Sequence, residues 1–159
     1  FVSYSKAGAG QGGDDSKVLL STNCFEVLGG TGDLIDFCTK PLSNVSPLSA
    51  SDKDFITFDF DNDLLPTKLA NEKEIYLCAQ AITTDGKVIT KCEGVPAMQF
   101  KPLPNDEYRL VIYPRAFFGL EKGQTLTQIS YKIANKTGSI QVGKRGTDEA
   151  FVYKFTPCN

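Results

Sequence analysis

The sequence predicts an all-β protein built as an antiparallel sandwich of two sheets, and three observations predict it. Short segments in which apolar and polar residues alternate recur along the chain, and this is the period of a half-buried strand. Turn-forming residues separate these segments at intervals typical of sandwiches, with a barrel as the weaker alternative. No segment keeps a helical period beyond a turn or two.

The expected strands follow a Gly-rich opening. Residues 1–17 begin with the β-prone FVSY and continue with a stretch that has the composition of a flexible linker. Residues 40–54, rich in proline and serine, are expected to be a connection, and RAFFGL a single helical turn. The strands are expected within the segments 17–23, 24–28, 34–38, 55–61, 74–83, 87–92, 108–114, 126–135 and 149–155.

Alternation within the strands assigns the side chains that face the core. Phe55, Thr57 and Asp59 fall on the opposite face of their strand. The expected core side chains are Ile56, Phe58, Phe60, Tyr108, Leu110, Ile112, Ile129, Tyr131, Ile133, Phe151, Tyr153 and Phe155.

The expected domain organisation is a tail followed by one domain. Residues 1–17 form a flexible or partner-bound tail, and residues 18–159 form a single sandwich domain. Within that domain, residues 18–54 are expected to be a hairpin extension and residues 55–159 the core module.

Four of the five cysteines bracket two expected hairpins. Cys24 and Cys38 lie symmetrically around a Gly-rich loop, and Cys78 and Cys92 lie around an Asp-Gly turn. Facing hairpin positions bring Cβ atoms about 4.5–5.5 Å apart, near the disulfide range. Cys78 faces Cys92 if the turn contains three residues or a bulge. We therefore predict at least one intrachain disulfide, first of all Cys24–Cys38, in an oxidising compartment.

The cysteines have other interpretations. In one, all five are reduced thiols of a cytosolic protein. In another they bind zinc, an alternative that the absence of CxxC and of histidine disfavours. The remaining cysteine, Cys158, forms an intermolecular bond, stays a free thiol, or pairs with Cys78 or Cys92, because connectivity cannot be deduced from sequence.

Composition argues against several function classes. The net charge is −2 and the basic residues are scattered, which disfavours nucleic acid and anionic membranes as partners. No apolar run reaches the roughly 18 residues of a membrane span. Histidine is absent, which removes the usual general base near neutral pH. We therefore expect no enzyme and no cofactor. Because the chain begins at Phe1 rather than Met, we expect a mature or excised product that has lost its targeting segment. The expected location is secreted, extracellular or at the cell surface.

Two groups of residues are candidate binding sites. Asp59, Asp61 and Asp63 alternate at a strand end, and hard oxygen ligands at such spacing can hold Ca²⁺. The EF-hand pattern is not met, and the alternative is a set of solvated acids beside a turn. Phe117 and Phe118 in RAFFGL are either surface anchors for a glycan or side chains packed under a loop, the ordinary fate of Phe.

The segment 55–155 contains a series of motifs in a fixed order. Residues 114–119 read PRAFFG and match a PR-x-F/Y-F/Y-G turn, and residues 123–125 match a following G-x-T. Residues 132–138 match an F-R-N-x-x-G segment only in part, because its Arg is missing. This series resembles an immunoglobulin-like module found on secreted surface proteins of Bacteroidota.

The resemblance implies an immunoglobulin-like fold and a place beside glycan-degrading enzymes or in adhesins. It therefore implies sugar binding or a spacer role. The sequence departs from that pattern in two ways. The chain lacks the His and Trp residues that such modules customarily contain, and an additional Cys-bracketed hairpin with a tail precedes the module.

Taken together, the sequence predicts an immunoglobulin-like sandwich with a disulfide-closed N-terminal hairpin, acting as a non-catalytic subunit of a surface fibre or adhesin. The subunits assemble by donating an N-terminal strand that contains Phe1, Val2 and Tyr4 to a neighbour, and Cys158 seals the contact. The spacer of about 13 residues spans about 20 Å on average. In the competing interpretation the tail folds back onto its own domain. The alternative function is a carbohydrate-binding module with polysaccharide as partner.

Overall fold

The structure is a computed structural model that describes residues 2–3, 18–19 and 40–156. It divides the chain into two units, Phe1–Lys40 and Pro41–Asn159. Some sequence predictions fall outside the described residues, namely those that concern Phe1, Tyr4, Cys24, Cys38 and Cys158.

The N-terminal unit contains a short antiparallel strand pair. β1 (Val2–Ser3) pairs with β2 (Val18–Leu19), and Val2 lies opposite Leu19. A pairing of two residues forms few ladder hydrogen bonds and is at best marginally stable by itself. The start of the chain, expected to be a donor strand, is therefore only weakly paired, with β2 of its own unit.

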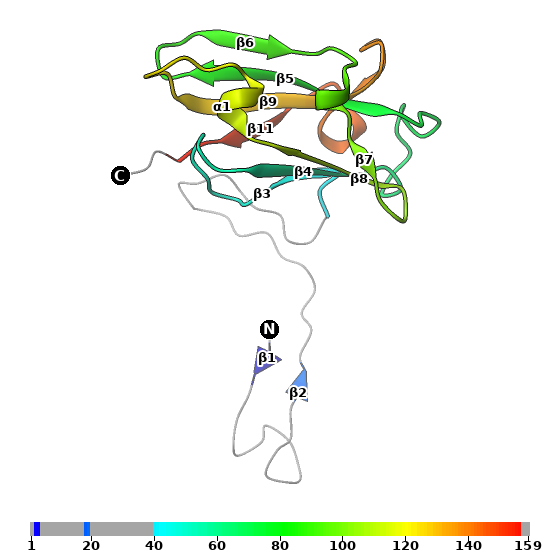
Figure 1. Cartoon of the computed structure of the whole chain (residues 1–159). Coiled ribbons are helices and arrows are strands. Elements are labelled where there is room, and N and C mark those ends of the chain that lie inside the picture. Colours follow the sequence, from blue (N-terminus) through cyan, green and yellow to red (C-terminus); the bar gives the residue numbers. More distant parts are fainter. Residues whose placement is uncertain (1, 4–17, 20–39, 157–159) are drawn as a thin grey trace. The chain divides into compact units, whose positions relative to one another are not determined.

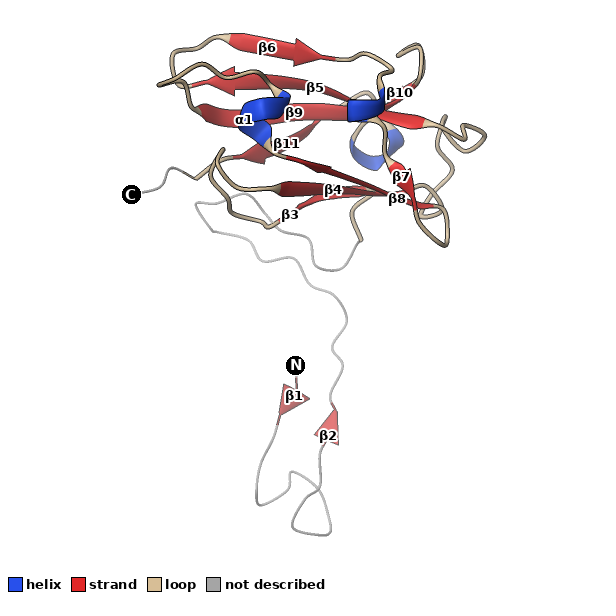
Figure 2. Ribbon diagram, viewed as in Figure 1, coloured by secondary structure: helices blue, strands red, loops and turns tan. Residues whose placement is uncertain are grey.

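The second unit is made of two antiparallel sheets that lie face to face (Figure 1), with almost no helix (Figure 2). One sheet has the order β3 (Ser43–Ser46), β4 (Ile56–Asp61), β8 (Glu107–Ile112), β7 (Lys101–Pro102). The other has the order β10 (Gln141–Val142), β9 (Leu126–Asn135), β5 (Ile75–Thr83), β6 (Val88–Lys91), with β11 (Phe151–Lys154) also beside β9. The helical turns are α1 (Pro114–Phe117), η1 (Pro96–Met98) and η2 (Lys144–Gly146). The predicted all-β, sandwich-like architecture is confirmed.

One strand lies where the sequence predicted a connection. β3 falls within residues 40–54 and pairs with β4, with Val45 opposite Phe58. Ser43 and Val45 are both buried. The units therefore divide after Lys40, and the sandwich begins before the expected start of the core module at residue 55. An edge strand tolerates proline at its ends and needs few inward side chains, so its composition resembles that of a loop.

The β5–β6 hairpin has the predicted geometry. Ala79 lies opposite Lys91, and the Thr83 N–H donates to the carbonyl oxygen of Lys87 at 3.0 Å. The loop therefore consists of residues 84–86, three in number, and Gly86 has a φ of 82°, which glycine adopts without strain. A turn of three residues is one of the two conditions under which Cys78 faces Cys92.

The core lies between the two sheets. The alternation predicted for β4, β8, β9 and β11 is confirmed, because the inward positions of these strands are buried and the intervening ones, apart from Ala134, are less so. Phe155, expected to follow this pattern, lies just after β11 and is partly buried. The buried side chains of these four strands include Ile56, Phe58, Phe60, Tyr108, Leu110, Ile112, Ile129, Tyr131, Ile133, Phe151 and Tyr153.

Tyr131 links the two sheets at the centre of this core. Its ring meets Phe58 edge-on at 4.8 Å and stacks on Phe151 at 5.0 Å between centroids. The Ser43 hydroxyl donates to the Asp59 carbonyl oxygen, so the Tyr131 hydroxyl donates to Ser43 Oγ over 3.1 Å. Burial raises the pKa of Tyr131 and outweighs the opposing effect of Ser43.

We expect Tyr131→Phe to cost about 1 kcal/mol of unfolding free energy at pH 7, because it removes a buried hydrogen bond. The cost should shrink as the pH rises above about 10, where Tyr ionises in the unfolded chain. The raised pKa keeps Tyr131 neutral in the folded protein, so its contribution is complete below that pH and is lost above it. Urea unfolding of both proteins between pH 7 and 11 measures this difference. A difference that does not change with pH would contradict the assignment.

Candidate functional site

The PRAFFG motif packs inward rather than forming a surface. Pro114 is the first residue of α1, and Gly119, which follows the helical turn, has a φ of 65°. Phe118 is only 3% exposed, and Phe117 is partly buried and meets Phe118 at 4.9 Å. The hypothesis of a glycan contact at Phe118 is therefore corrected, because its ring is part of the core. The alternative, packing under a loop, describes both residues.

Arg115 of the motif forms a largely buried ion pair. Its Nη1 donates to Asp52 Oδ2 at 2.8 Å and to the Gln124 carbonyl oxygen at 2.8 Å. Its Nη2 donates to the Glu121 carbonyl oxygen at 3.3 Å. Asp52 also accepts the backbone N–H of Leu126. The guanidinium thus joins the segment before β4 to the turn before β9, which gives this arginine a structural role.

Two of the three predicted calcium ligands, Asp59 and Asp61, use their carboxylates in contacts within the protein. Asp59 Oδ1 accepts a hydrogen bond from Arg109 Nε at 2.6 Å. Asp61 Oδ1 accepts the backbone N–H groups of Asp63 and Leu64 and thereby closes a turn. Among the residues that the structure describes, no group of three or more acidic, Cys or His side chains is placed to hold a metal ion. The alternative of acids at a strand end beside a turn agrees with this geometry.

The Cys78–Cys92 disulfide is present and joins neighbouring strands. Cys78 alternates with the buried Leu77 and Ala79 along β5, so the bridge lies on the outward face of its sheet. Continuing the register of β5 and β6 places Cys92 directly opposite Cys78, just after β6 ends. The disulfide therefore fixes the end of the edge strand β6 to β5. The predicted pairing of these two cysteines is confirmed.

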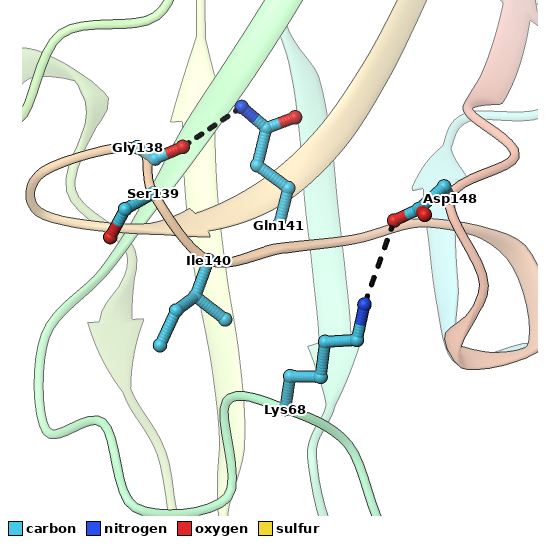
Figure 3. A pocket seen from close by; sticks show the side chains of 6 residues that line it. All are labelled: Lys68, Gly138, Ser139, Ile140, Gln141 and Asp148. Carbon is cyan, nitrogen blue, oxygen red and sulfur yellow. Dashed lines mark hydrogen bonds and ion pairs between the residues drawn. The ribbon is translucent and has the colours of Figure 1, made fainter.

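A shallow hollow lies beside the turn between β9 and β10 (Figure 3), and its lining residues are Lys68, Gly138, Ser139, Ile140, Gln141 and Asp148. Lys68 and Asp148 face each other across it at 3.8 Å and are both largely exposed. Gln141 Nε2 donates to the Gly138 carbonyl oxygen at 3.1 Å. An exposed ion pair of this kind contributes little to stability. The lining residues present no nucleophile with an adjacent base.

Comparison with known families assigns the sandwich. Residues 43–142 match the model of a family described as a domain of unknown function (DUF8578), which is more than half of the chain. The chain belongs to the DUF8578 family. The DUF8578 match begins at β3 and ends at β10, so it contains the whole of one sheet and all of the other except β11. Comparison with curated proteins gave no match.

Within the described part of this DUF8578 chain, no helix is long and apolar enough to cross a membrane. Two outward features of its sandwich were not identified from the sequence as sites. The first is an aromatic pair formed by the exposed Phe55 and the half-buried Tyr113. The sequence signal for it was the assignment of Phe55 to the outward face of its strand. The second is the outer backbone edge of β6, which no sequence pattern indicates because strand order is a non-local property.

We expect Arg115→Ala to lower the unfolding free energy by about 3–5 kcal/mol, because Asp52 would remain buried without its partner. Arg109→Ala is the matched control, since its pair with Asp59 is more exposed and should contribute less than about 1 kcal/mol. Urea unfolding at pH 7 compares the two. Equal losses in both variants would argue against the special role of Arg115.

We expect the double substitution Cys78→Ala and Cys92→Ala to cost about 3 kcal/mol, the stability gained by closing a loop of roughly 15 residues. Val152→Ala, an exposed change in the same sheet, should stay within about 0.5 kcal/mol. Thermal and urea unfolding measure both. A loss of less than about 1 kcal/mol in the double variant would mean that the hairpin does not need its bridge.

Proposed function

We propose that this chain is a non-catalytic, secreted surface module with an immunoglobulin-like fold, and that it self-assembles by strand addition. The strand order supports the fold. If β3, β4, β5, β6, β7, β8, β9 and β11 are taken as A, B, C, C′, D, E, F and G, the sheets read A-B-E-D and G-F-C-C′. Immunoglobulin domains have this arrangement. The motif series between residues 55 and 155 adds independent support from sequence.

The core supports the same proposal. Antibody domains join strands B and F with a disulfide. Here the corresponding strands, β4 and β9, meet through the rings of Phe58 and Tyr131. The Cys78–Cys92 bridge lies within one sheet instead. A disulfide is typical of proteins in oxidising compartments, which favours secretion.

The outer edge of β6 is the observation that carries the proposed self-assembly. The Thr83–Lys87 hydrogen bond shows that Lys87 directs its backbone carbonyl toward β5. Every second residue of an antiparallel strand does the same, so residues 89 and 91 also direct their backbone N–H and C=O groups toward β5. Val88 and Thr90 direct theirs away from the sheet. No described residue forms a hydrogen bond with those outward groups. Val88 is 57% exposed, so the edge is an accessible template for another strand.

The donor in this proposal is the N-terminal strand of a second copy. β1 is held by two residue pairs with β2, whereas β6 offers four residues in a rigid edge. The disulfide beside Lys91 keeps this edge attached to β5 while a new strand pairs with it. If β1 leaves β2 and pairs with β6 of another copy, it exchanges two residue pairs for a longer pairing, which favours the intermolecular contact.

Thr90→Pro tests this proposal, because it removes an outward N–H and leaves the ladder to β5 intact. We expect the full chain to form oligomers that grow with concentration and Thr90→Pro to remain monomeric. Light scattering after size exclusion and negative-stain microscopy measure the assembly. Thr90→Ala keeps the N–H and should assemble normally.

A variant that lacks residues 1–13 tests the donor and should also be monomeric. A full chain that is monomeric at high concentration would overturn the proposed self-assembly. If Thr90→Pro assembles like the unmodified chain while the truncated variant does not, the donor is correct and β6 is not the acceptor.

A further inference from the structure

The outward face of the β3-β4-β8-β7 sheet is arranged in rows of different chemistry. Ile56 lies opposite Ile112, so Phe55 and Tyr113 form the next cross-strand pair, here called the aromatic row. Thr57 and Val111 form the row beside it. The row after that crosses all four strands and is here called the polar row, with Asn44, Asp59, Arg109 and Lys101 in register.

The aromatic row contains apolar surface that the contact between its two rings leaves exposed. The rings of Phe55 and Tyr113 lie 5.4 Å apart and are tilted by 45°. A cross-strand aromatic pair of this kind stabilises a sheet by about 0.2–1 kcal/mol. Phe55 nevertheless remains 69% exposed, so Tyr113 covers only part of it. Val111, diagonally adjacent, is 54% exposed and extends the apolar surface by one side chain.

The polar row offers preorganised hydrogen-bonding groups. Arg109 Nε is held by Asp59 at 2.6 Å, which orients the guanidinium along the sheet. No described residue bonds the two terminal nitrogens of Arg109, and Lys101 and Asn44 are exposed. The row therefore presents an amide, a carboxylate, a guanidinium and an ammonium group. It lies about 13 Å from the aromatic row, since Asp59 follows Phe55 by four steps of about 3.3 Å along the strand.

We propose that this face binds an oligosaccharide, with a pyranose ring on Phe55 and Tyr113 and the following sugars reaching the polar row. A pyranose has an apolar C–H face that packs on an aromatic ring and a rim of hydroxyls that bind amide, carboxylate and guanidinium groups. The sequence of rows matches both properties in order. The bound sugar covers the exposed part of Phe55, and the Asp59–Arg109 pair both accepts and donates hydrogen bonds to hydroxyls.

A protein partner fits this face less well. A stable protein interface covers about 800 Å² on each partner and has a core depleted in charge. Here the apolar surface consists of Phe55, Val111 and Tyr113, and the charged Asp59–Arg109 pair follows one row later. The face also belongs to the sheet that does not contain β6, so this inference does not depend on the proposed self-assembly.

The test is affinity electrophoresis of the full chain in gels that contain soluble β-glucan, galactomannan, xylan or polygalacturonate, followed by calorimetry with fragments of any polysaccharide that binds. We expect at least one to retard the protein. Phe55→Ala and Tyr113→Ala should each weaken binding by about tenfold or more, the loss typical of a central aromatic contact. Val152→Ala, an exposed apolar change in the other sheet, is the matched control and should bind normally.

Circular dichroism and unfolding midpoints verify that the variants fold. Arg109→Ala should weaken binding without changing the aromatic contact, and Lys101→Ala should weaken binding chiefly of polygalacturonate, because it removes a cation. The proposal is overturned if none of the polysaccharides retards the protein, or if Phe55→Ala binds as well as the unmodified chain. It is also overturned if the Phe55 and Tyr113 variants change only the oligomer size, because the face is then a protein interface.

Discussion

The contact between Tyr131 and Phe58 is the constraint on which the rest of the sandwich depends. These rings come from the central strands of opposite sheets, and Phe151 and Ser43 add contacts from β11 and β3. Once these positions are committed to the core, the period of two fixes the direction of every other side chain on those strands. Phe55 is directed outward for the same reason that Ile56 is directed inward. The outward surfaces thus follow from the packing of the core.

Two connections, an ion pair and a disulfide, hold the periphery to this core. The Arg115–Asp52 pair joins two segments that precede strands of different sheets, and its backbone contacts fix the turn that contains Gly123. The Cys78–Cys92 bridge holds the edge strand β6, which pairs with a neighbour on one side only. Both are placed where the ladder alone provides few hydrogen bonds. The PRAFFG motif is therefore explained by packing and by a buried charge pair, without any ligand.

The two sheets present different chemistry to their surroundings. The sheet with β6 offers unpaired backbone groups at Val88 and Thr90, which suit another strand. The sheet with β4 and β8 offers side chains, first aromatic and then charged, which suit a sugar chain. Because these surfaces lie on different sheets, occupation of one leaves the other accessible. The two proposals, strand addition at β6 and sugar binding on the opposite sheet, are therefore compatible with each other.

The sequence by itself determined the strands β4, β5, β6, β8, β9 and β11, their inward faces and the Cys78–Cys92 hairpin. Each of these depends on residues close together in the chain, through the period of two and the geometry of an Asp-Gly turn. Only the tertiary structure decided which aromatic residues are exposed. Phe118 is covered and Phe55 is not, because exposure depends on which elements pack over each face. It also decided the role of Arg115, whose partner Asp52 lies 63 residues away, and the strand at 43–46, whose loop-like composition hides two side chains that only β4 and the opposite sheet bury. Contacts of such separation leave no local pattern, so they are fixed only when the two sheets come together.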